Sequence, residues 1–254
     1  MASDSPLTIL ITGASAGFGM AMTRRFVRDG HRVIATARRE ERLRVLADEL
    51  GDAVLPVALD VTDAAATAAL PDGLPDGWRE VDVLVNNAGL ALGLDPAQAA
   101  KLSDWDTMIA TNITGLVHVT RALLPGMVAR DRGHVVNLGS TAGTYPYPGG
   151  HVYGATKAFV KQFTLNLKTD LVGTNVRVTS IEPGLVGGSE FSNIRIGDDA
   201  KAAAVYAGTV PLNPDDIAEA VSWVVQLPKH MNVNRMELMP TCQAPGPLTV
   251  KRTG

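Results

Sequence analysis

The sequence predicts an α/β fold in which a parallel sheet carries helices on both faces. Short apolar runs alternate with helical patterns along the chain, and strands joined through helices pair in parallel, because each helix returns the chain to the same end of the sheet. The run at 7–11 leads into a glycine-rich turn and then into a helical pattern, with Phe18, Met22 and Phe26 four residues apart. We therefore expect a doubly wound parallel sheet.

Seven strands are expected, with helical patterns between them. The expected strands lie at 7–12, 32–37, 53–59, 81–86, 133–139, 176–182 and 234–239. Three residues are candidate N-caps of helices: Thr62, Ser103 and Asn213, the last of which a proline follows. The alanine-rich segment at 64–69 is expected to form a helix that packs closely against the sheet.

The composition agrees with one folded domain. With 254 residues, of which 46% are hydrophobic, the chain can bury a sizeable core, so we expect a single domain over residues 1–254. The net charge is −3 and no basic face is clustered, which argues against nucleic acid or an anionic membrane as the main partner.

Cysteine and histidine usage bears on the compartment and on metal binding. The single cysteine, Cys242, excludes an internal disulfide and is compatible with a reducing compartment. Residues 1–6 lack the basic segment of a signal peptide, and no apolar run approaches the roughly 18 residues that span a bilayer. We therefore expect a cytoplasmic protein. The five histidines show no ligand spacing, so no metal is expected.

Three glycines, Gly13, Gly17 and Gly19, directly follow the first expected strand. They remove the Cβ atoms that would keep a pyrophosphate from the backbone, and the N–H groups and positive dipole end of the next helix then face that anion. The spacing Gly-x-x-x-Gly-x-Gly differs from the usual Gly-x-Gly-x-x-Gly, and such a turn can also serve packing alone. Its place after the first strand favours a nucleotide phosphate and a Rossmann-type fold.

The end of the second expected strand predicts which dinucleotide binds. A site for NAD usually has an acidic residue there, about 20 residues after the glycine turn, to bind the ribose 2′-hydroxyl. Here the strand ends in Arg38 and Arg39. Guanidinium groups can hold a 2′-phosphate in a fork, so this pair indicates NADP. The alternative is a solvated pair that precedes the helix at 40–50.

Tyr153 and Lys157 are four residues apart in a helical pattern and therefore face the same way. A cation about 5 Å from the phenol, at an effective dielectric constant near ~20, favours the phenolate by about 3 kcal/mol, or about two pKa units. Tyr153 is thus a candidate for proton transfer. Taken alone, the pair also fits an ordinary solvated helix surface.

The chain resembles the short-chain dehydrogenase/reductase family over nearly its whole length. The motifs that carry the resemblance are the glycine turn at 12–19, Asn86 to Gly89, Asn112, Ser140, Tyr153, Lys157, and Pro183 with Gly184. The stretches at 84–93, 152–160 and 181–193 resemble, more closely, the bacterial NADP-dependent 3-hydroxy acid dehydrogenases. Those enzymes oxidise serine or allo-threonine and reduce malonic semialdehyde. The resemblance also implies a homotetramer that pairs through the helices at 103–130 and 153–172.

The resemblance implies a set of site residues. The expected catalytic residues are Asn112, Ser140, Tyr153 and Lys157. The expected cofactor-binding residues are Gly13, Ser15, Gly17, Phe18, Gly19, Arg38, Arg39, Asp60, Val61, Asn87, Ala88, Gly89, Tyr153, Lys157, Pro183, Gly184 and Val186. Ser140 would bind the substrate oxygen and Tyr153 would supply the proton. Lys157 would bind the nicotinamide ribose and lower the pKa of Tyr153. Asn112 would distort its helix and help to hold a water near Lys157.

Substrate choice is expected to depend on the segment at 141–150, which contains Tyr147, and on a lid at about 187–210. Arg195 in the lid is the candidate clamp for a substrate carboxylate, because Lys157 would bind the ribose and Arg38 and Arg39 would lie at the far end of the cofactor. The alternative is a surface arginine that pairs with Glu190 or Asp198.

The expected function is an NADP-dependent transfer of hydride between the nicotinamide and a small 3-hydroxy or 3-oxo acid. One alternative is a carbonyl reductase of the same family that acts on a bulkier ketone or aldehyde. Another is a non-catalytic sensor that binds NADP, but such a protein could lose Tyr153 or Lys157, and both are present.

Overall fold

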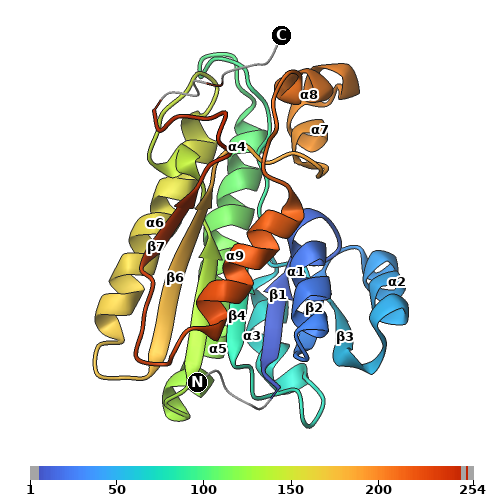
Figure 1. The fold of residues 1–254 in the computed structure, drawn as a ribbon, viewed down its shortest axis with the longest axis vertical. Coiled ribbons are helices and arrows are strands. Elements are labelled where there is room, and N and C mark those ends of the chain that lie inside the picture. The colour runs from blue at the N-terminus through green and yellow to red at the C-terminus, as the bar shows by residue number, and fades with distance from the viewer. Residues whose placement is uncertain (1–5, 247–249, 251–254) are drawn as a thin grey trace.

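The computed structural model describes residues 6–246 and Val250, so most of the segment examined for a signal peptide lies outside the described residues. Within the described chain, seven parallel strands form one sheet in the order β3-β2-β1-β4-β5-β6-β7 (Figure 1). The strands are β1 (Thr8–Thr12), β2 (Arg32–Ala37), β3 (Val54–Ala58), β4 (Val83–Asn86), β5 (Gly133–Leu138), β6 (Val176–Pro183) and β7 (Arg235–Leu238). The predicted fold class is confirmed, and each strand lies within two residues of its expected range.

Helices connect the strands and cover both faces of the sheet (Figure 1). They are α1 (Gly17–Arg28), α2 (Glu40–Leu50), α3 (Ala64–Gly73), α4 (Leu102–Ile109), α5 (Leu116–Ala129), α6 (His151–Asp170), α7 (Phe191–Ile196), α8 (Asp199–Tyr206) and α9 (Pro214–Gln226). A π-helix, η2 (Ala110–Gly115), joins α4 to α5, and short 3₁₀ turns are η1 (Gly51–Ala53) and η3 (Thr141–Gly143).

The core consists of two layers, one on each face of the sheet. Successive residues of a strand point to opposite faces, so Ile9 and Ile11 of β1 pack with α1, α2 and α9, whereas Leu10 packs with α3, α5 and α6. The β1 strand pairs on both sides, with Ile9 opposite Val33 in β2 and opposite Val83 in β4. A strand buried in this way needs the continuous apolar run that the sequence has there.

Two of the three predicted N-caps are wrong. Asp63, not Thr62, caps α3, because its carboxylate accepts from the backbone N–H groups of the first turn. The Thr62 hydroxyl binds Asp60 instead. The α4 helix begins before Ser103, which therefore lies within the first turn and is not a cap. Asn213 caps α9 as predicted, within a capping box that stabilises the start of that helix.

The two edges of the sheet differ in character. β3 forms one edge and has Pro56 at its centre, opposite Ala35 of β2. β7 forms the other edge and carries the charged residues Arg235 and Glu237. The strands run upward in Figure 1, and the helices α7 and α8 lie beyond their carboxyl ends. In the described residues, we find no helix with the length and apolar character to cross a membrane.

Candidate active site

A cleft of about 360 Å³ opens at the carboxyl ends of the central strands, where parallel sheets bind ligands. Most of the expected cofactor-binding residues line it, namely Gly13, Ser15, Gly17, Phe18, Arg38, Arg39, Asp60, Val61, Asn87, Ala88, Gly89, Tyr153 and Lys157. Gly19, Pro183, Gly184 and Val186 lie outside its wall. The Val186 side chain is buried in the core, so any contact that Val186 makes with a cofactor would come from its backbone.

The glycine turn brings the chain close to β4. A Cβ on Gly19 would lie 2.3 Å from the carbonyl oxygen of Gly13, so only glycine fits there. Gly17 has a positive φ of 51°, which favours glycine at the start of α1. The Asn87 amide donates to the carbonyl oxygens of Thr12 and Gly13 and fixes the turn against β4. The turn is therefore a rigid, open cradle that fits a dinucleotide phosphate.

Positive charge gathers at the adenosine end expected for the cleft. Arg38 and Arg39 follow β2 and are both exposed, and the Arg39 Nε donates to the Ser15 hydroxyl at 3.3 Å. Burial raises the pKa of Asp60, but hydrogen bonds from Thr62 and the charge of Arg38 outweigh this effect, so the net pKa is lowered. The predicted donors for a 2′-phosphate thus lie together at the cleft.

Asn112 is buried in the π-helix η2, where the predicted distortion is present. Its side-chain oxygen accepts from the Leu90 N–H at 2.9 Å, and its side-chain nitrogen donates to the Leu90 carbonyl at 2.8 Å. The same nitrogen donates to Thr156 in α6. Asn112 therefore joins the segment after β4 to the helix that carries Tyr153 and Lys157.

Tyr153 and Lys157 lie on one face of α6 as predicted, with the Lys157 Nζ 5.9 Å from the centre of the Tyr153 ring. The predicted lowering of the tyrosine pKa is wrong for this structure. Burial raises the pKa of Tyr153 to about 12, although a hydrogen bond from Ser140 and the charge of Arg195 act in the opposite direction. Burial also lowers the pKa of Lys157 to about 8. The Lys157 ammonium donates to the Leu138 carbonyl at 2.7 Å, and not to the phenol.

Arg195 of α7 lies between two tyrosine rings, of which that of Tyr153 lines the cleft. Its guanidinium carbon is 5.2 Å from the ring centre of Tyr147 and 5.4 Å from that of Tyr153. It donates to the carbonyl oxygens of Gly93 and Gly149. The alternative in which Arg195 pairs with Glu190 or Asp198 is wrong, because Glu190 pairs with Arg39 and Arg42 and Asp198 pairs with Lys201.

Tyr147, the expected substrate residue of the segment at 141–150, lies against Arg195. Its phenol oxygen is buried and has no hydrogen-bond partner among the described residues. Burial raises the pKa of this phenol. The Arg195 guanidinium beside the phenol lowers its pKa, but burial outweighs this effect.

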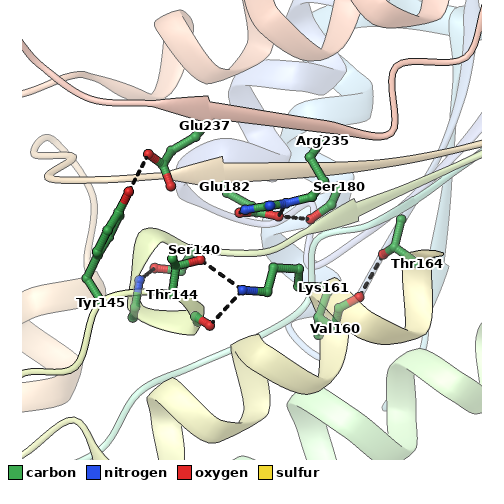
Figure 2. A network of polar contacts seen from close by, with 12 residues as sticks. Ser140, Thr144, Tyr145, Val160, Lys161, Thr164, Ser180, Glu182, Arg235 and Glu237 are labelled. Carbon is green, nitrogen blue, oxygen red and sulfur yellow. Dashed lines mark hydrogen bonds and ion pairs between the residues drawn. The ribbon is translucent and has the colours of Figure 1, made fainter. Parts of the chain in front are cut away.

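A network of polar contacts holds the same segment against the edge of the sheet (Figure 2). The Tyr145 hydroxyl donates to Glu237 of β7 at 3.1 Å, and the Lys161 ammonium donates to the Thr144 hydroxyl at 3.0 Å. Beside them, the buried Glu182 forms a two-point ion pair with Arg235 at 2.8 and 2.6 Å. Glu182 therefore faces β7, which shows that it packs a strand end and does not point into the cleft.

Comparisons with known proteins identify the family of this chain. A family profile described as short chain dehydrogenase matches residues 7–197. The chain belongs to the short-chain dehydrogenase family. It is 59% identical over 247 residues to the NADP-dependent 3-hydroxy acid dehydrogenase of Escherichia coli K12, with 97% of this chain and all of the relative covered. It is 54% identical to the serine 3-dehydrogenase of Rhizobium radiobacter over 93% of this chain and 95% of the relative.

Solved short-chain dehydrogenase structures are similar over nearly the whole chain. The closed form of serine dehydrogenase complexed with NADP⁺ has a TM-score of 0.94 and 59% identity, with 97% of this chain and 100% of that chain covered. A serine dehydrogenase from Escherichia coli has a TM-score of 0.84 and 55% identity, with 94% of this chain and 100% of that chain covered. The predicted family is confirmed.

Several residues of the cleft were not predicted from the sequence. They are Ala16, Ala37, Leu59, Leu90, Ala91, Thr111, Leu138, Gly139, Ser189, Glu190, Phe191 and Ile194. The last four belong to the segment expected to be a lid. A lid closes over a cleft, so this expectation could have predicted that they line it. Phe191 lies with its ring centre 5.8 Å from that of Tyr153, and such a contact requires the fold to bring α7 over α6.

Proposed function

We propose that this short-chain dehydrogenase transfers hydride between NADP(H) and a small 3-hydroxy or 3-oxo acid, of the serine, allo-threonine or malonic semialdehyde type. The names of the relatives support the cofactor and the substrate class. The observation that carries the proposal is the guanidinium of Arg195, placed between Tyr147 and the proton donor Tyr153. A cation at that point suits a substrate that bears a carboxylate close to its hydroxyl.

The residues of the cleft fit NADP. The glycine turn would receive the pyrophosphate, and Arg38 with Arg39 would hold the 2′-phosphate, since guanidinium groups bind phosphate in a fork. Asp60 and Val61 would border the adenine, and Lys157 would bind the nicotinamide ribose. Asn87 and Gly89 line the cleft between these groups. The bound NADPH supplies the hydride, and the chain supplies orientation and electrostatics.

Ser140 and Tyr153 act on the substrate oxygen. As the carbonyl carbon accepts hydride, negative charge grows on that oxygen, and the Ser140 hydroxyl donates a hydrogen bond to it. The neutral Tyr153 phenol then gives its proton to the same oxygen. The raised pKa of Tyr153 keeps the phenol protonated near neutral pH, which suits reduction. In oxidation Tyr153 would first release its own proton to solvent, and the phenolate would then take the proton of the alcohol. Asn112, by fixing α6 to the segment after β4, would position Tyr153 and Lys157 and would hold a water near Lys157.

The carboxylate of the substrate would bind Arg195. Two of its N–H groups are held by the carbonyl oxygens of Gly93 and Gly149, so the guanidinium is fixed in place before a substrate arrives. Fixed donors lose little entropy when they bind an anion. We also propose that residues 1–254 form one catalytic domain with a lid at about 187–210, that the protein is cytoplasmic, and that it is a homotetramer.

The experiment compares acids with neutral alcohols. NADP⁺ reduction is measured with serine, allo-threonine, 3-hydroxypropionate and 3-hydroxyisobutyrate, and with secondary alcohols of similar size that lack a carboxylate. We expect the acids to be preferred and Arg195→Ala to reduce kcat/KM for them by about 10- to 100-fold, because a charge-assisted contact contributes about 1.5–3 kcal/mol. The matched control is Lys201→Ala, which removes an exposed cation from α8.

Two outcomes would contradict the proposal. Equal losses for acids and neutral alcohols in Arg195→Ala would mean that Arg195 is not the carboxylate site. A preference of the unchanged protein for bulky neutral ketones would favour the carbonyl reductase alternative.

A further inference from the structure

An ion-pair cluster joins the base of the expected lid to an arginine of the cofactor cleft. One carboxylate oxygen of Glu190 binds Arg39 at 2.9 Å, and the other binds Arg42 at 2.9 Å. Hydrogen bonds from Arg42 and Arg39 hold the pKa of Glu190 below its usual range, so this carboxylate is charged. Glu190 and its partners are about 150 residues apart in the sequence, and the fold alone brings them together.

The three side chains occupy different surfaces. Arg39 and Glu190 both line the cofactor cleft, and Arg39 also donates to Ser15 of the glycine turn. Arg42 does not line that cleft. It lines a larger groove of about 1020 Å³ between α1, α2 and α8, which Glu190 also borders. Glu190 therefore lies at the boundary, with one arginine on the cofactor side and a second arginine on the other side.

A 2′-phosphate and the Glu190 carboxylate need the same donors. Both are anionic acceptors for the Arg39 guanidinium, and a phosphate at the cleft would lie near the carboxylate and be repelled by it. Arg42 gives Glu190 a second partner, so the carboxylate can leave Arg39 without losing its whole ion pair. NAD lacks the 2′-phosphate, so its binding does not require Glu190 to leave Arg39.

We propose that Glu190 is a specificity-determining residue that competes with the 2′-phosphate of NADP(H) for Arg39 and stays with Arg42 when the phosphate binds. Glu190 thereby weakens NADP(H) binding selectively and favours release of the spent cofactor. This inference rests on the proposed function only in taking NADP as the cofactor.

Cofactor binding without substrate provides the test. The dissociation constants of NADPH and NADH are measured by fluorescence titration for the unchanged protein, for Glu190→Gln and for Glu41→Gln. Glu41 is an exposed acid of α2 that lines the larger groove beside Arg42, so its variant removes the same charge from a neighbouring position. We expect Glu190→Gln to lower the dissociation constant of NADPH about three- to fivefold, as befits an exposed ion pair, and that of NADH less than twofold. Glu41→Gln should change neither constant by more than about twofold.

Arg42→Ala adds a second arm. If Arg42 acts by drawing Glu190 away from Arg39, Arg42→Ala should weaken NADPH binding in the unchanged protein and should have little effect in the Glu190→Gln background. Equal weakening of NADPH and NADH binding by Glu190→Gln would instead make Glu190 a clamp for α7 and overturn the proposal. No change, or the same change in Glu41→Gln, would also overturn it. Equal affinity of the unchanged protein for NADPH and NADH would contradict the NADP assignment itself, which is a separate result.

Discussion

Lys157 is buried at the cleft and Tyr153 is partly buried there, and burial shifts their pKa values in opposite directions. An acid is harder to ionise when it is buried, and a base is harder to protonate. The pKa of Tyr153 therefore rises to about 12 and that of Lys157 falls to about 8. Their spacing in the sequence correctly placed them on one face of a helix. It could not reveal that the lysine would donate to the Leu138 carbonyl.

Tyr153→Phe should abolish most turnover and leave cofactor binding intact. The change removes the hydroxyl that gives its proton to the substrate and keeps the ring that packs against Phe191. We expect kcat to fall by about 10²- to 10⁴-fold, the usual contribution of a general acid, and the dissociation constant of NADPH to stay within about twofold. Steady-state kinetics and fluorescence titration measure the two quantities. A variant that keeps most of its activity would exclude Tyr153 as the proton donor.

Lys157→Met should stabilise the fold at pH 7 and lose activity. Below the folded-state pKa of about 8, the lysine is charged in both states, and only the folded state bears the cost of burial. Between pH 8 and the pKa of lysine in the unfolded chain, about 10.5, the unfolded chain binds more protons than the folded one. The free energy of unfolding therefore rises with pH, by about 3 kcal/mol at most. Loss of the Leu138 hydrogen bond offsets part of the gain, which leaves about 1–2 kcal/mol at pH 7.

Urea unfolding at pH 7 and at about pH 10 checks this prediction. The difference between Lys157→Met and the unchanged protein should shrink as the pH approaches 10.5, because the lysine of the unfolded chain then becomes neutral as well. A variant that is less stable than the unchanged protein at pH 7 would show that the Leu138 contact outweighs the burial of charge.

At the scale of elements, the π-helix η2 is associated with the hydrogen bonds of one side chain, that of Asn112. Asn112 uses both ends of its amide on the backbone of Leu90, much as a neighbouring strand would. The extra residue in the turn of η2 brings that amide into position, and π-turns of this kind are frequent at functional sites. An asparagine inside a helical pattern indicated the distortion from the sequence, but not its partner.

The segment at 141–150 lies between a fixed edge strand and the expected lid. Tyr145 binds Glu237 of β7 at one end, and the Gly149 carbonyl accepts from Arg195 at the other. Tyr145→Phe and Glu237→Ala should each loosen this segment and raise KM for the acid substrate about two- to fivefold, with a smaller change in kcat, because a single exposed hydrogen bond is lost. Steady-state kinetics on serine measure both constants.

Glu237→Gln is the matched control, because it keeps an oxygen that accepts from the Tyr145 hydroxyl. It should behave as the unchanged protein does. The double variant of Tyr145→Phe and Glu237→Ala should be no worse than either single variant, since both remove the same contact. Additive effects would show that the two residues act separately.

The order of the helices and strands could be predicted from the sequence, but the side-chain contacts between them could be predicted only in part. Alternating apolar and helical patterns record local chemistry, and every strand was found near its expected range. The caps at Thr62 and Ser103 were misplaced because several polar residues adjoin each helix start, and only the backbone geometry selects one. Glu190 was considered as a partner of Arg195 because they are close in sequence. Its true partners, Arg39 and Arg42, come from the other half of the sheet.

At the scale of the whole molecule, we predict a homotetramer through the helices at 103–130 and 153–172. On α6, Leu167 belongs to the core, whereas Phe159 is 37% exposed and stacks on Phe163. Ile109 and Val128 are further exposed apolar side chains on the other helical segment. Light scattering should return a tetramer at micromolar concentration, and Phe159→Glu should shift it to a smaller species. Val210→Glu, in an exposed position outside both helices, should not.

A monomer in light scattering of the unchanged protein at micromolar concentration would refute the tetramer. The same dissociation in Phe159→Glu and in Val210→Glu would mean that added charge, and not the α6 surface, disrupts the assembly.

Pro56 at the centre of β3 has a consequence for how copies of this molecule can meet. A proline is tolerated in an outer strand where its missing N–H faces away from the neighbouring strand, so the open side of β3 lacks a donor at its middle. A strand that paired with the open side of β3 would lack the hydrogen bond from residue 56. A fibre that grows by strand pairing at this edge is therefore disfavoured. Growth by strand pairing is therefore disfavoured at the β3 edge, which agrees with our prediction of an assembly that pairs through helices and has a fixed number of subunits.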